Sequence, residues 1–308
     1  MTARAAVLDK DDRTPITERI TKALDSLPTL PLVALKLGEL IHSRNTSMKQ
    51  VVELLQSDPS LSAKLLRLVN SAYFGIPGGV SDIARAVPFV GFNTLYQLAL
   101  SISVLQTLTA KGGRRFDPKQ LWLHSLTVGT AGKVLAEEAK LADPGSLFTA
   151  GLLHDIGKIA LAKVDPESFL NAFDLAELEG VPMIEAERRC GLPTHDRLGA
   201  RLAKQWRFPT SLSSPIELHH DIERPEVRGR LALAQRRPAE AIALSDLLAH
   251  RIAKATGAPT DDGEQPDGVV AMLEDLGVSE RRLEGYRDKT LKALDNSRAF
   301  IQLIESMT

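Results

Sequence analysis

Apolar residues recur at three- and four-residue spacing along almost the whole chain, and alternating strand-like patterns are nearly absent. Four Asp-Pro pairs punctuate this pattern: Asp58-Pro59, Asp117-Pro118, Asp143-Pro144 and Asp165-Pro166. Aspartate accepts hydrogen bonds from the free amides of a helix start, and proline suits the first helical position because its missing N–H costs nothing there. Each pair therefore predicts a helix start, and the chain is expected to be an all-α, multi-helix bundle.

The glycine- and arginine-containing segment Lys111 to Arg115 separates two strongly helical regions. Residues 15–110 are predicted to form an N-terminal helical subdomain, and residues 111–255 a second bundle that holds most of the histidines. Residues 1–14 lack the apolar core of a secretory signal and are expected to be a flexible arm. Residues 256–308 are predicted to be a mobile loop, rich in Gly, Pro and Asp up to Gly268, and two C-terminal helices, the last starting near Ser279.

Composition excludes few functions, but it bears on the partners, the cellular compartment and membrane insertion. The net charge of −1 gives no sign of a nucleic-acid or anionic-membrane partner. The single cysteine, Cys190, cannot form an internal disulfide, which fits a reducing, cytoplasmic compartment. Residues 86–110 carry no charge, but amides such as Asn93 and Gln97 would be costly inside a bilayer, so a buried helix of a soluble protein is expected.

The placement of the histidines is the main chemical signal. Five of the seven lie between residues 124 and 220, as single and paired sites, and Asp155 and Asp246 add carboxylates to the pattern. The candidate ligands are His124, His154, Asp155, His195, His219, His220 and Asp246. This mixture suits Fe, Mn, Zn, Ni or Co better than Ca or Mg, and such sites are built inside bundles from facing helices. A divalent transition-metal cofactor, of one or two ions, is therefore expected.

The segment from Gly151 to Lys158, GLLHDIGK, is the most specific part of the pattern. Its apolar residues are expected to bury a helix end, which would bury the polar pair His154-Asp155 with it. Burying such a pair without partners costs several kcal/mol in rough terms, so a metal ion or a hydrogen-bond network is required.

This segment resembles the HD-domain signature of metal-dependent phosphohydrolases. Two upstream segments, Leu27–Leu32 and Ser57–Ser71, and the downstream segment His195–Trp206 with Phe208-Pro209 resemble the HDOD family of bacterial signalling proteins. The resemblance spans roughly residues 25–250. It implies an all-helical output module with an HD-like core, often without part of the metal set and generally without demonstrated hydrolysis.

The same resemblance implies a distribution of ligands over two ions. One ion would be held by His124, His154, Asp155 and Asp246, and the second by Asp155, as a bridge, with His195, His219 and His220. Two such ions can polarise a phosphoryl group and activate a bridging hydroxide. In that case Asp155 and Lys158 would be the catalytic residues, with Lys158 contacting a substrate phosphate from the same side of the helix.

Three functions remain open from the sequence. The favoured one is a signalling output module that binds a partner protein or a nucleotide ligand. The second is a metal-dependent phosphohydrolase or phosphodiesterase acting on a nucleotide or cyclic dinucleotide, and the third is a di-iron oxygenase. The HD-GYP cyclic di-GMP phosphodiesterases follow their histidine pair with an Asp-Gly-x-Gly-Tyr-Pro sequence, whereas Asp221–Pro225 here reads DIERP, which argues against that substrate.

The remaining polar features have simpler interpretations. His42 and His250 are predicted to be helix-end histidines, and for His42 a cation there suits the helix dipole. Because His250 lies one turn after Asp246, contact with the metal site is the alternative for it. A cluster of arginines is predicted to be a solvated face, with an anionic-ligand rim as the alternative. Its members are Arg224, Arg228, Arg230, Arg236 and Arg237.

Overall fold

The computed structural model describes residues 15–42, 46–108, 116–141, 143–256 and 268–306, without the side chains of residues 41, 42 and 256. The predicted arm, the segment 111–115, most of the predicted mobile loop and the side chain of His42 lie outside the described residues. Within them every regular element is a helix, which confirms the all-α prediction. The helices are α1 Ile16–Asp25, α2 Leu32–His42, α3 Met48–Gln56, α4 Pro59–Val69, α5 Ile83–Val90, α6 Phe92–Thr107, α7 Pro118–Glu138, α8 Pro144–Leu153, α9 Ile156–Val164, α10 Pro166–Glu179, α11 Met183–Arg189, α12 His195–Gln205, α13 Thr210–Leu218, α14 Pro225–Arg228, α15 Leu233–Thr256, α16 Val269–Leu276, the 3-10 turn η1 Glu280–Arg282, α17 Leu283–Asp295 and α18 Arg298–Glu305.

All four Asp-Pro pairs begin helices, namely α4, α7, α8 and α10. Asp58, Asp117 and Asp165 each accept a hydrogen bond from a backbone amide of the first turn, as an N-cap should. Asp143 differs, because its backbone is left-handed, with φ of 50°. Its carboxylate instead accepts hydrogen bonds from the side chains of Asn93 and Ser146, and so joins the start of α8 to α6.

The described part of the uncharged stretch, residues 86–108, contains the end of α5 and the whole of α6 rather than one helix. Gly91, with φ of 80°, allows the chain to turn sharply between the two, and their axes differ by 116°. The residues of α6 from Leu95 to Leu105 are buried inside the fold. Among the described residues no single helix has the length and apolarity to cross a membrane, and only this bent pair passes when taken together.

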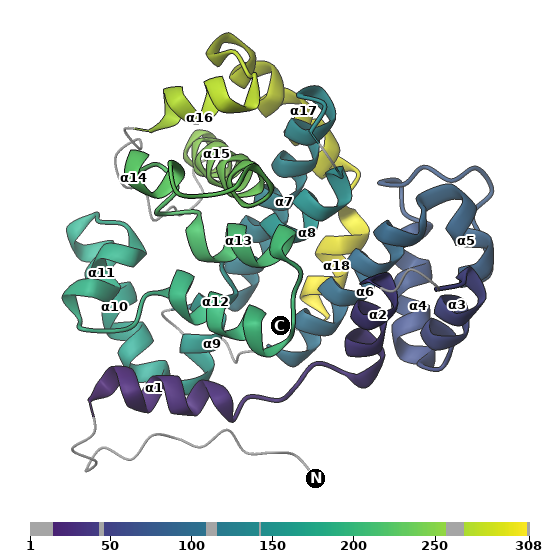
Figure 1. Cartoon of the computed structure of the whole chain (residues 1–308), viewed down its shortest axis with the longest axis horizontal. Helices are drawn as coiled ribbons and strands as arrows, with labels where there is room; N and C mark the ends of the chain where they lie inside the picture. The colour runs from purple at the N-terminus through teal and green to yellow at the C-terminus, as the bar shows by residue number, and fades with distance from the viewer. Residues whose placement is uncertain (1–14, 43–45, 109–115, 142, 257–267, 307–308) are drawn as a thin grey trace.

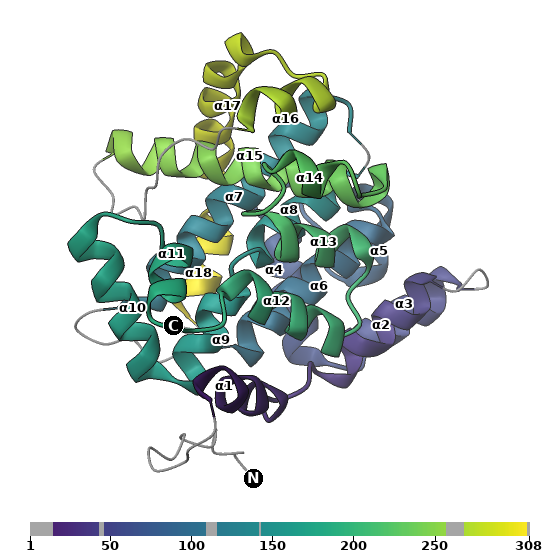
Figure 2. The ribbon, with the colours of Figure 1, turned by 60° about the vertical axis from the view of Figure 1, so that its left-hand side comes forward.

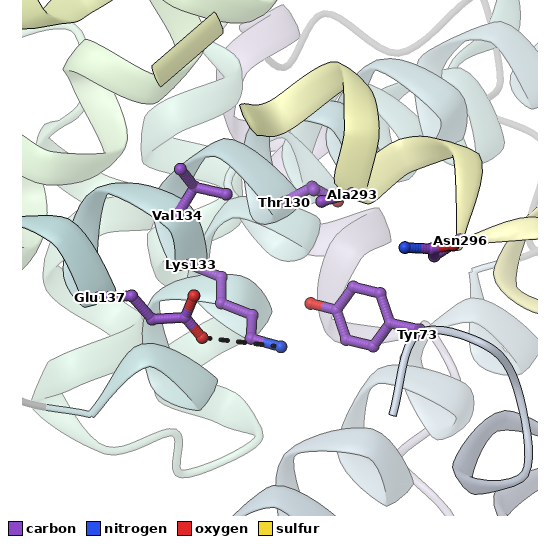
Figure 3. A pocket seen from close by; sticks show the side chains of 7 residues that line it. All are labelled: Tyr73, Thr130, Lys133, Val134, Glu137, Ala293 and Asn296. Carbon is purple, nitrogen blue, oxygen red and sulfur yellow. Dashed lines mark ion pairs between the residues drawn. The ribbon is translucent and has the colours of Figure 1, made fainter. Parts of the chain in front are cut away.

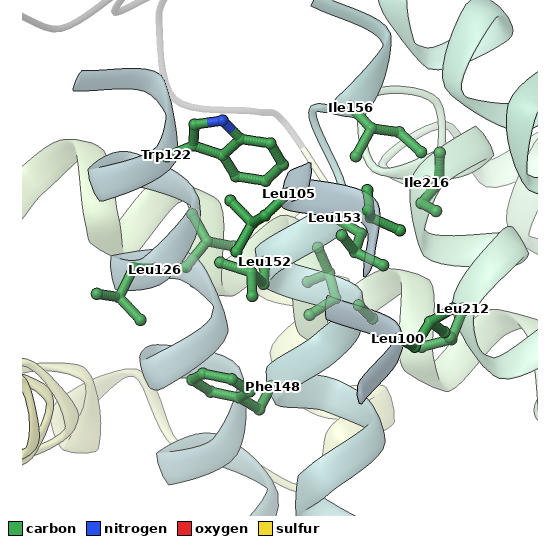
Figure 4. Packing of buried hydrophobic residues seen from close by; sticks show 14 of the residues in the cluster. Leu100, Leu105, Trp122, Leu126, Phe148, Leu152, Leu153, Ile156, Leu212 and Ile216 are labelled. Atoms are coloured by element: carbon green, nitrogen blue, oxygen red, sulfur yellow. The ribbon is translucent and has the colours of Figure 1, made fainter. Parts of the chain in front are cut away.

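Helix α7 is the centre of the fold, as Figures 1 and 2 show. Helices α8, α15, α17 and α18 all pack against it, and α13 lies against α8, α12 and α15. Figure 4 shows the resulting core, where Trp122 and Leu126 of α7 meet Phe148 and Leu152 of α8. These side chains are almost fully buried, so burial of α7 and α8 against each other sets the frame that carries the candidate ligands.

The first helices cover one side of this core. Helices α2, α4 and α5 pack against α6, and α6 packs against α8. Helix α1 lies apart from them, beside α9 and α12 (Figures 1 and 2), where Arg201 Nη2 and Asp25 Oδ2 are 2.6 Å apart. One continuous hydrophobic cluster runs from Ile20 to Ile304. The proposed division of the chain near residues 111–115 stays a prediction.

The prediction of one final helix from about Ser279 is wrong. Helix α17 ends at Asp295, and α18 begins at Arg298 after a turn. The turn lets Phe300 pack against Phe148 and Tyr73, with ring centroids 5.1 and 5.6 Å apart. Tertiary packing of this aromatic group therefore outweighs the helical continuity of the sequence.

Two of the five clustered arginines belong to an internal ion-pair group. Arg228 Nε lies 3.2 Å and Arg236 Nε 3.6 Å from Oε1 of Glu240, which is fully buried. Both arginines also contact Asp275, so the group joins α14, α15 and α16. Burial, and then the hydrogen bond with Asp275, raise the pKa of Glu240 to about 7. These two arginines therefore stabilise helix packing, and an anionic-ligand rim would have to rely on the others.

Candidate metal centre

Two backbone contacts hold the segment that carries His154 and Asp155. A Cβ atom on Gly151 would lie 2.6 Å from the Cα of Gly129, so α8 crosses α7 in direct backbone contact. A Cβ on Gly157 would lie 1.9 Å from the carbonyl oxygen of His195, so α9 meets α12 equally closely. Since α8 ends at Leu153 and α9 begins at Ile156, the His-Asp pair lies in the short turn between these crossings.

Asp155 is the centre of an inner group of donors. Its Oδ1 lies 3.3 Å from Nε2 of His195 and 3.7 Å from Nε2 of His219. Its Oδ2 lies 3.3 Å from Nε2 of His154. His220 completes the group, with its Nε2 2.9 Å from Nε2 of His195. The turn before α9, the start of α12 and the turn after α13 therefore supply one group of donors around a single carboxylate.

A second group extends from the other side of Asp155 towards α7 and α15. His124 Nε2 lies 3.0 Å from Oδ1 of Asp246 and 4.0 Å from Oδ2 of Asp155. His154 Nε2 lies 3.7 Å from the same oxygen of Asp246. The structure thus brings together all seven ligand candidates of the sequence, although 122 positions (246 − 124) separate the first from the last.

Hydrogen bonds on the far side of three rings orient their free nitrogens. Nδ1 of His154 lies 2.7 Å from the carbonyl oxygen of Gly151, and Nδ1 of His219 lies 3.1 Å from that of Pro215. Nδ1 of His195 lies 2.8 Å from a carboxylate oxygen of Glu187. Because these oxygens only accept, each Nδ1 carries the hydrogen, and in the neutral ring the lone pair of Nε2 points into the cluster. This is the arrangement by which outer partners orient metal-bound histidines.

The residues fit a transition-metal ion. Asp155 Oδ1, His219 Nε2 and His124 Nε2 are buried and make no hydrogen bond with the described residues. Buried polar atoms without a partner are costly, and a cation between them would remove that cost. Imidazole nitrogens with carboxylate oxygens are ligands suited to Fe, Mn, Zn, Co or Ni.

The charges of the cluster also suit a cation. Burial opposes ionisation of Asp155, but His154 and Lys158 beside it hold the pKa of that carboxyl well below its usual range. Burial lowers the pKa of His219, and burial together with His219 lowers the pKa of His220 well below its ordinary value. The carboxylate is therefore charged and these two rings are neutral, which are the forms that bind metal. Burial opposes protonation of His154 and His195, but Asp155 raises the pKa of His154 and Glu187 that of His195, so an ion at these rings would compete with a proton.

Lys158 occupies a position of its own. Its ammonium lies 2.9 Å from Oδ2 of Asp155, one turn away along the chain, and only 8% of its side chain is exposed. The continuous helix that would have placed Lys158 on the same side as His154 is interrupted, since α8 ends at Leu153 and α9 begins at Ile156. The ammonium still reaches the cluster, where its contact is with the carboxylate. The ammonium partly neutralises the charge of Asp155. A metal ion bound to the same carboxylate oxygen would be repelled by the positive charge of Lys158.

Two further residues contact the cluster: Glu187, which the sequence did not single out, and His250, for which contact with the site was the less favoured alternative. Glu187 is fully buried and accepts both the backbone N–H and the ring N–H of His195, each at 2.8 Å. The sequence feature that could have revealed Glu187 is its position as an acidic residue near the apolar Ile184, Ala186 and Leu192. His250 was interpreted as a helix-end histidine, but α15 continues to Thr256, and the His250 ring turns towards Asp246, with Nε2 3.3 Å from Oδ1.

Replacing Glu187 by Gln is expected to weaken metal binding while leaving the ligands in place. The amide keeps the shape but loses the charge that holds the His195 ring, so affinity for Co²⁺ should fall by about 10- to 100-fold. A competition titration with a chelating dye measures this. Glu185→Gln, at an exposed position on the same helix, is the control, and equal affinity of both variants would contradict the role given to Glu187.

A separate small pocket shares no residue with the cluster. Figure 3 shows it between Tyr73, α7 and the C-terminal helices, with a volume of about 80 Å³. The ammonium of Lys133 lies 4.1 Å from the centre of the Tyr73 ring and 3.9 Å from Glu137. The contact with Tyr73 joins the segment after α4 to α7.

Comparison with known proteins agrees with the helical architecture. A crystal structure of an HDOD domain protein of unknown function from Geobacter sulfurreducens is 25% identical, with a TM-score of 0.69, and the match covers 96% of this chain and 98% of that one. A candidate signal transduction protein from Marinobacter aquaeolei is 22% identical, with a TM-score of 0.72 over 93% of this chain and 61% of that one. An uncharacterised protein of Treponema pallidum is 28% identical over 213 residues, which are 68% of this chain but only 40% of that protein.

The chain therefore spans less than half the length of this curated relative. The family model for the HDOD domain matches residues 27–222, which include the His-Asp pair and the His219-His220 pair. This range covers most of the chain and includes every candidate ligand except Asp246. The chain belongs to the HDOD domain family.

Proposed function

We propose that this chain is a signal-transduction module of the HDOD type whose buried cluster holds two divalent transition-metal ions. The convergence of seven donor side chains, with ring nitrogens turned inwards by outer hydrogen bonds, carries this proposal. One ion would be held by His124, His154, Asp155 and Asp246. Asp155 would bridge it to a second ion, held with His195, His219 and His220.

In this proposal the ions serve mainly to link helices. Asp155, His154 and His195 are at most 1% exposed, and Lys158 lies on the bridging carboxylate, so a substrate has little access to the inner ligands. The ligands come from α7, the α8–α9 turn, α12, the turn after α13 and α15. An ion bound by all of them stabilises the folded arrangement, because the unfolded chain does not gather these groups. Metal occupancy would then determine the surface offered to a partner protein or nucleotide ligand.

Phosphoester hydrolysis is the second candidate. The observation that favours it is the complete ligand set, together with a more open end where the side chains of His124 and Asp246 are 19% and 14% exposed. Bound ions would supply Lewis-acid activation of a phosphoryl group and of water. The chain would contribute Asp155 as the bridging carboxylate, and Lys158 as the cation nearest to it.

The two candidates are separated by comparing the wild type with Asp155→Ala. Protein purified without chelator is expected to contain two metal equivalents and to melt at a higher temperature with added Mn²⁺, and the variant should lose both properties. Asp288→Ala, an exposed position on α17, is the control. Wild-type protein without bound metal would overturn the proposal.

The same proteins are then assayed with an aryl phosphodiester and with cyclic dinucleotides in metal-replete buffer. Little turnover is expected from either protein under the signalling proposal. Robust turnover by the wild type that vanishes in Asp155→Ala, at a temperature where both are folded, would establish the hydrolase instead.

A further inference from the structure

The end of the cluster nearest to solvent contains a third group of donors, formed by His124, Asp246 and His250. Two donors that bind one ion at about 2.1 Å lie about 3.0 to 3.4 Å from each other. Oδ1 of Asp246 is 3.0 Å from Nε2 of His124 and 3.3 Å from Nε2 of His250. Both spacings from the Asp246 oxygen therefore match donors that share one ion, whereas the 4.0 Å between His124 and Asp155 is longer.

The outer group differs from the inner ones in exposure. The side chains of His124, Asp246 and His250 are 19%, 14% and 19% exposed, against 1% for Asp155 and His154. Two imidazoles and one carboxylate leave open coordination positions for water on an octahedral ion. A hydrated ion arriving from solvent can therefore keep part of its water shell here, which the buried inner positions do not allow.

Two members of the outer group are shared with the next position inwards. His124 offers the same ring nitrogen to Asp246 and to Asp155, and one nitrogen binds only one ion at a time. The inner position adds His154 and Asp155 to the shared His124 and Asp246, so it offers more donors and a second negative charge. An ion bound at the outer group is therefore expected to move to the inner position, where the free energy of binding is more favourable, while it stays bound to His124 and Asp246.

We infer that His250 completes an entry position for the metal ions, a transient 2-His-1-carboxylate site that captures a divalent transition-metal ion and passes it to the inner position through His124 and Asp246. The inference rests on the proposed metal-binding function. It gives His250 a role in the rate of loading and none in the final ligand set.

The test follows loading of metal-free protein with Co²⁺ by rapid mixing, using the visible absorption of the bound ion. His250→Ala and His250→Gln are compared with the wild type and with Lys254→Gln, one turn further along the same helix and exposed. Uptake should slow by at least about tenfold in both His250 variants. The number of ions bound at equilibrium and the final spectrum should match those of the wild type and the control.

The outcomes are distinct. Unchanged uptake rates in both variants would overturn the entry position, while the proposed metal function would stand if the wild type still binds two equivalents. Loss of one bound ion would make His250 a permanent ligand and would also overturn it. A wild type that binds no Co²⁺ would remove the proposed function itself. Circular dichroism of each variant confirms that the helices are kept.

Discussion

Gly157→Ala is expected to destabilise the protein by about 3 kcal/mol or more and to abolish tight metal binding. The new Cβ would lie 1.9 Å from the carbonyl oxygen of His195 and 2.7 Å from its carbonyl carbon. Both are backbone atoms of the first turn of α12, so no side chain can rotate to make room. Helices α9 and α12 must separate, and His195 moves away from Asp155 with its helix.

Urea unfolding of metal-free protein and Co²⁺ titration measure the two effects. Gly285→Ala is the matched control, because Gly285 lies inside α17 and a Cβ there would meet no atom within 4 Å. This control should be more stable than the wild type by about 0.5 to 1 kcal/mol, since alanine favours the helix. A Gly157→Ala protein within about 1 kcal/mol of the wild type would show that the crossing is not rigid.

The ligand set could be predicted from the sequence because residue type carries its chemistry. Histidine and aspartate side chains that are buried with apolar segments require polar partners. His124, His154 and Asp246 are each other's partners in the structure. The four helix starts were predictable for a similar reason, since Asp-Pro pairs act locally. The roles of the ligands stay a prediction, but their meeting in space is observed.

The features that escaped prediction depend on contacts between distant segments. Glu187 matters because the turn between α11 and α12 brings its carboxylate under the His195 ring, and no local pattern records that turn. The turn between α17 and α18 depends on the packing of Phe300 against Phe148, which is distant in the sequence. His250 is a different case, because its contact is local: it lies one turn after Asp246 on α15, so contact with the site was already the alternative to a helix-end histidine.

Lys158→Met is expected to have opposite effects on the metal-free and metal-bound protein. Without metal, the variant leaves the buried Asp155 carboxylate without its nearest lysine, which should cost about 3 kcal/mol of stability at neutral pH. Methionine fills the same space, so packing changes little. With metal, the ion supplies the missing positive charge, and removal of the competing ammonium should raise the affinity for Co²⁺ by at least about tenfold.

The pH dependence follows from the same contact. Lys158 helps to depress the pKa of Asp155 in the folded state, so this carboxylate contributes stability above its unfolded pKa and loses it as pH falls through the folded pKa. The variant has less of this stability to lose. In chelator, the stability difference between wild type and Lys158→Met should therefore be largest at neutral pH and should shrink as the solution is acidified.

Urea unfolding across this pH range, with chelator and with Co²⁺, measures these effects together. Lys119→Met, which removes a surface ion pair with Glu305, is the control and should cost less than about 1 kcal/mol at any pH. If Lys158→Met matches the wild type in chelator and binds Co²⁺ no more tightly, the ammonium does not compete with metal at Asp155. If the expected pattern is found, Lys158 holds the metal-free cluster together until an ion displaces it, which couples metal binding to a change of charge at the centre of the fold.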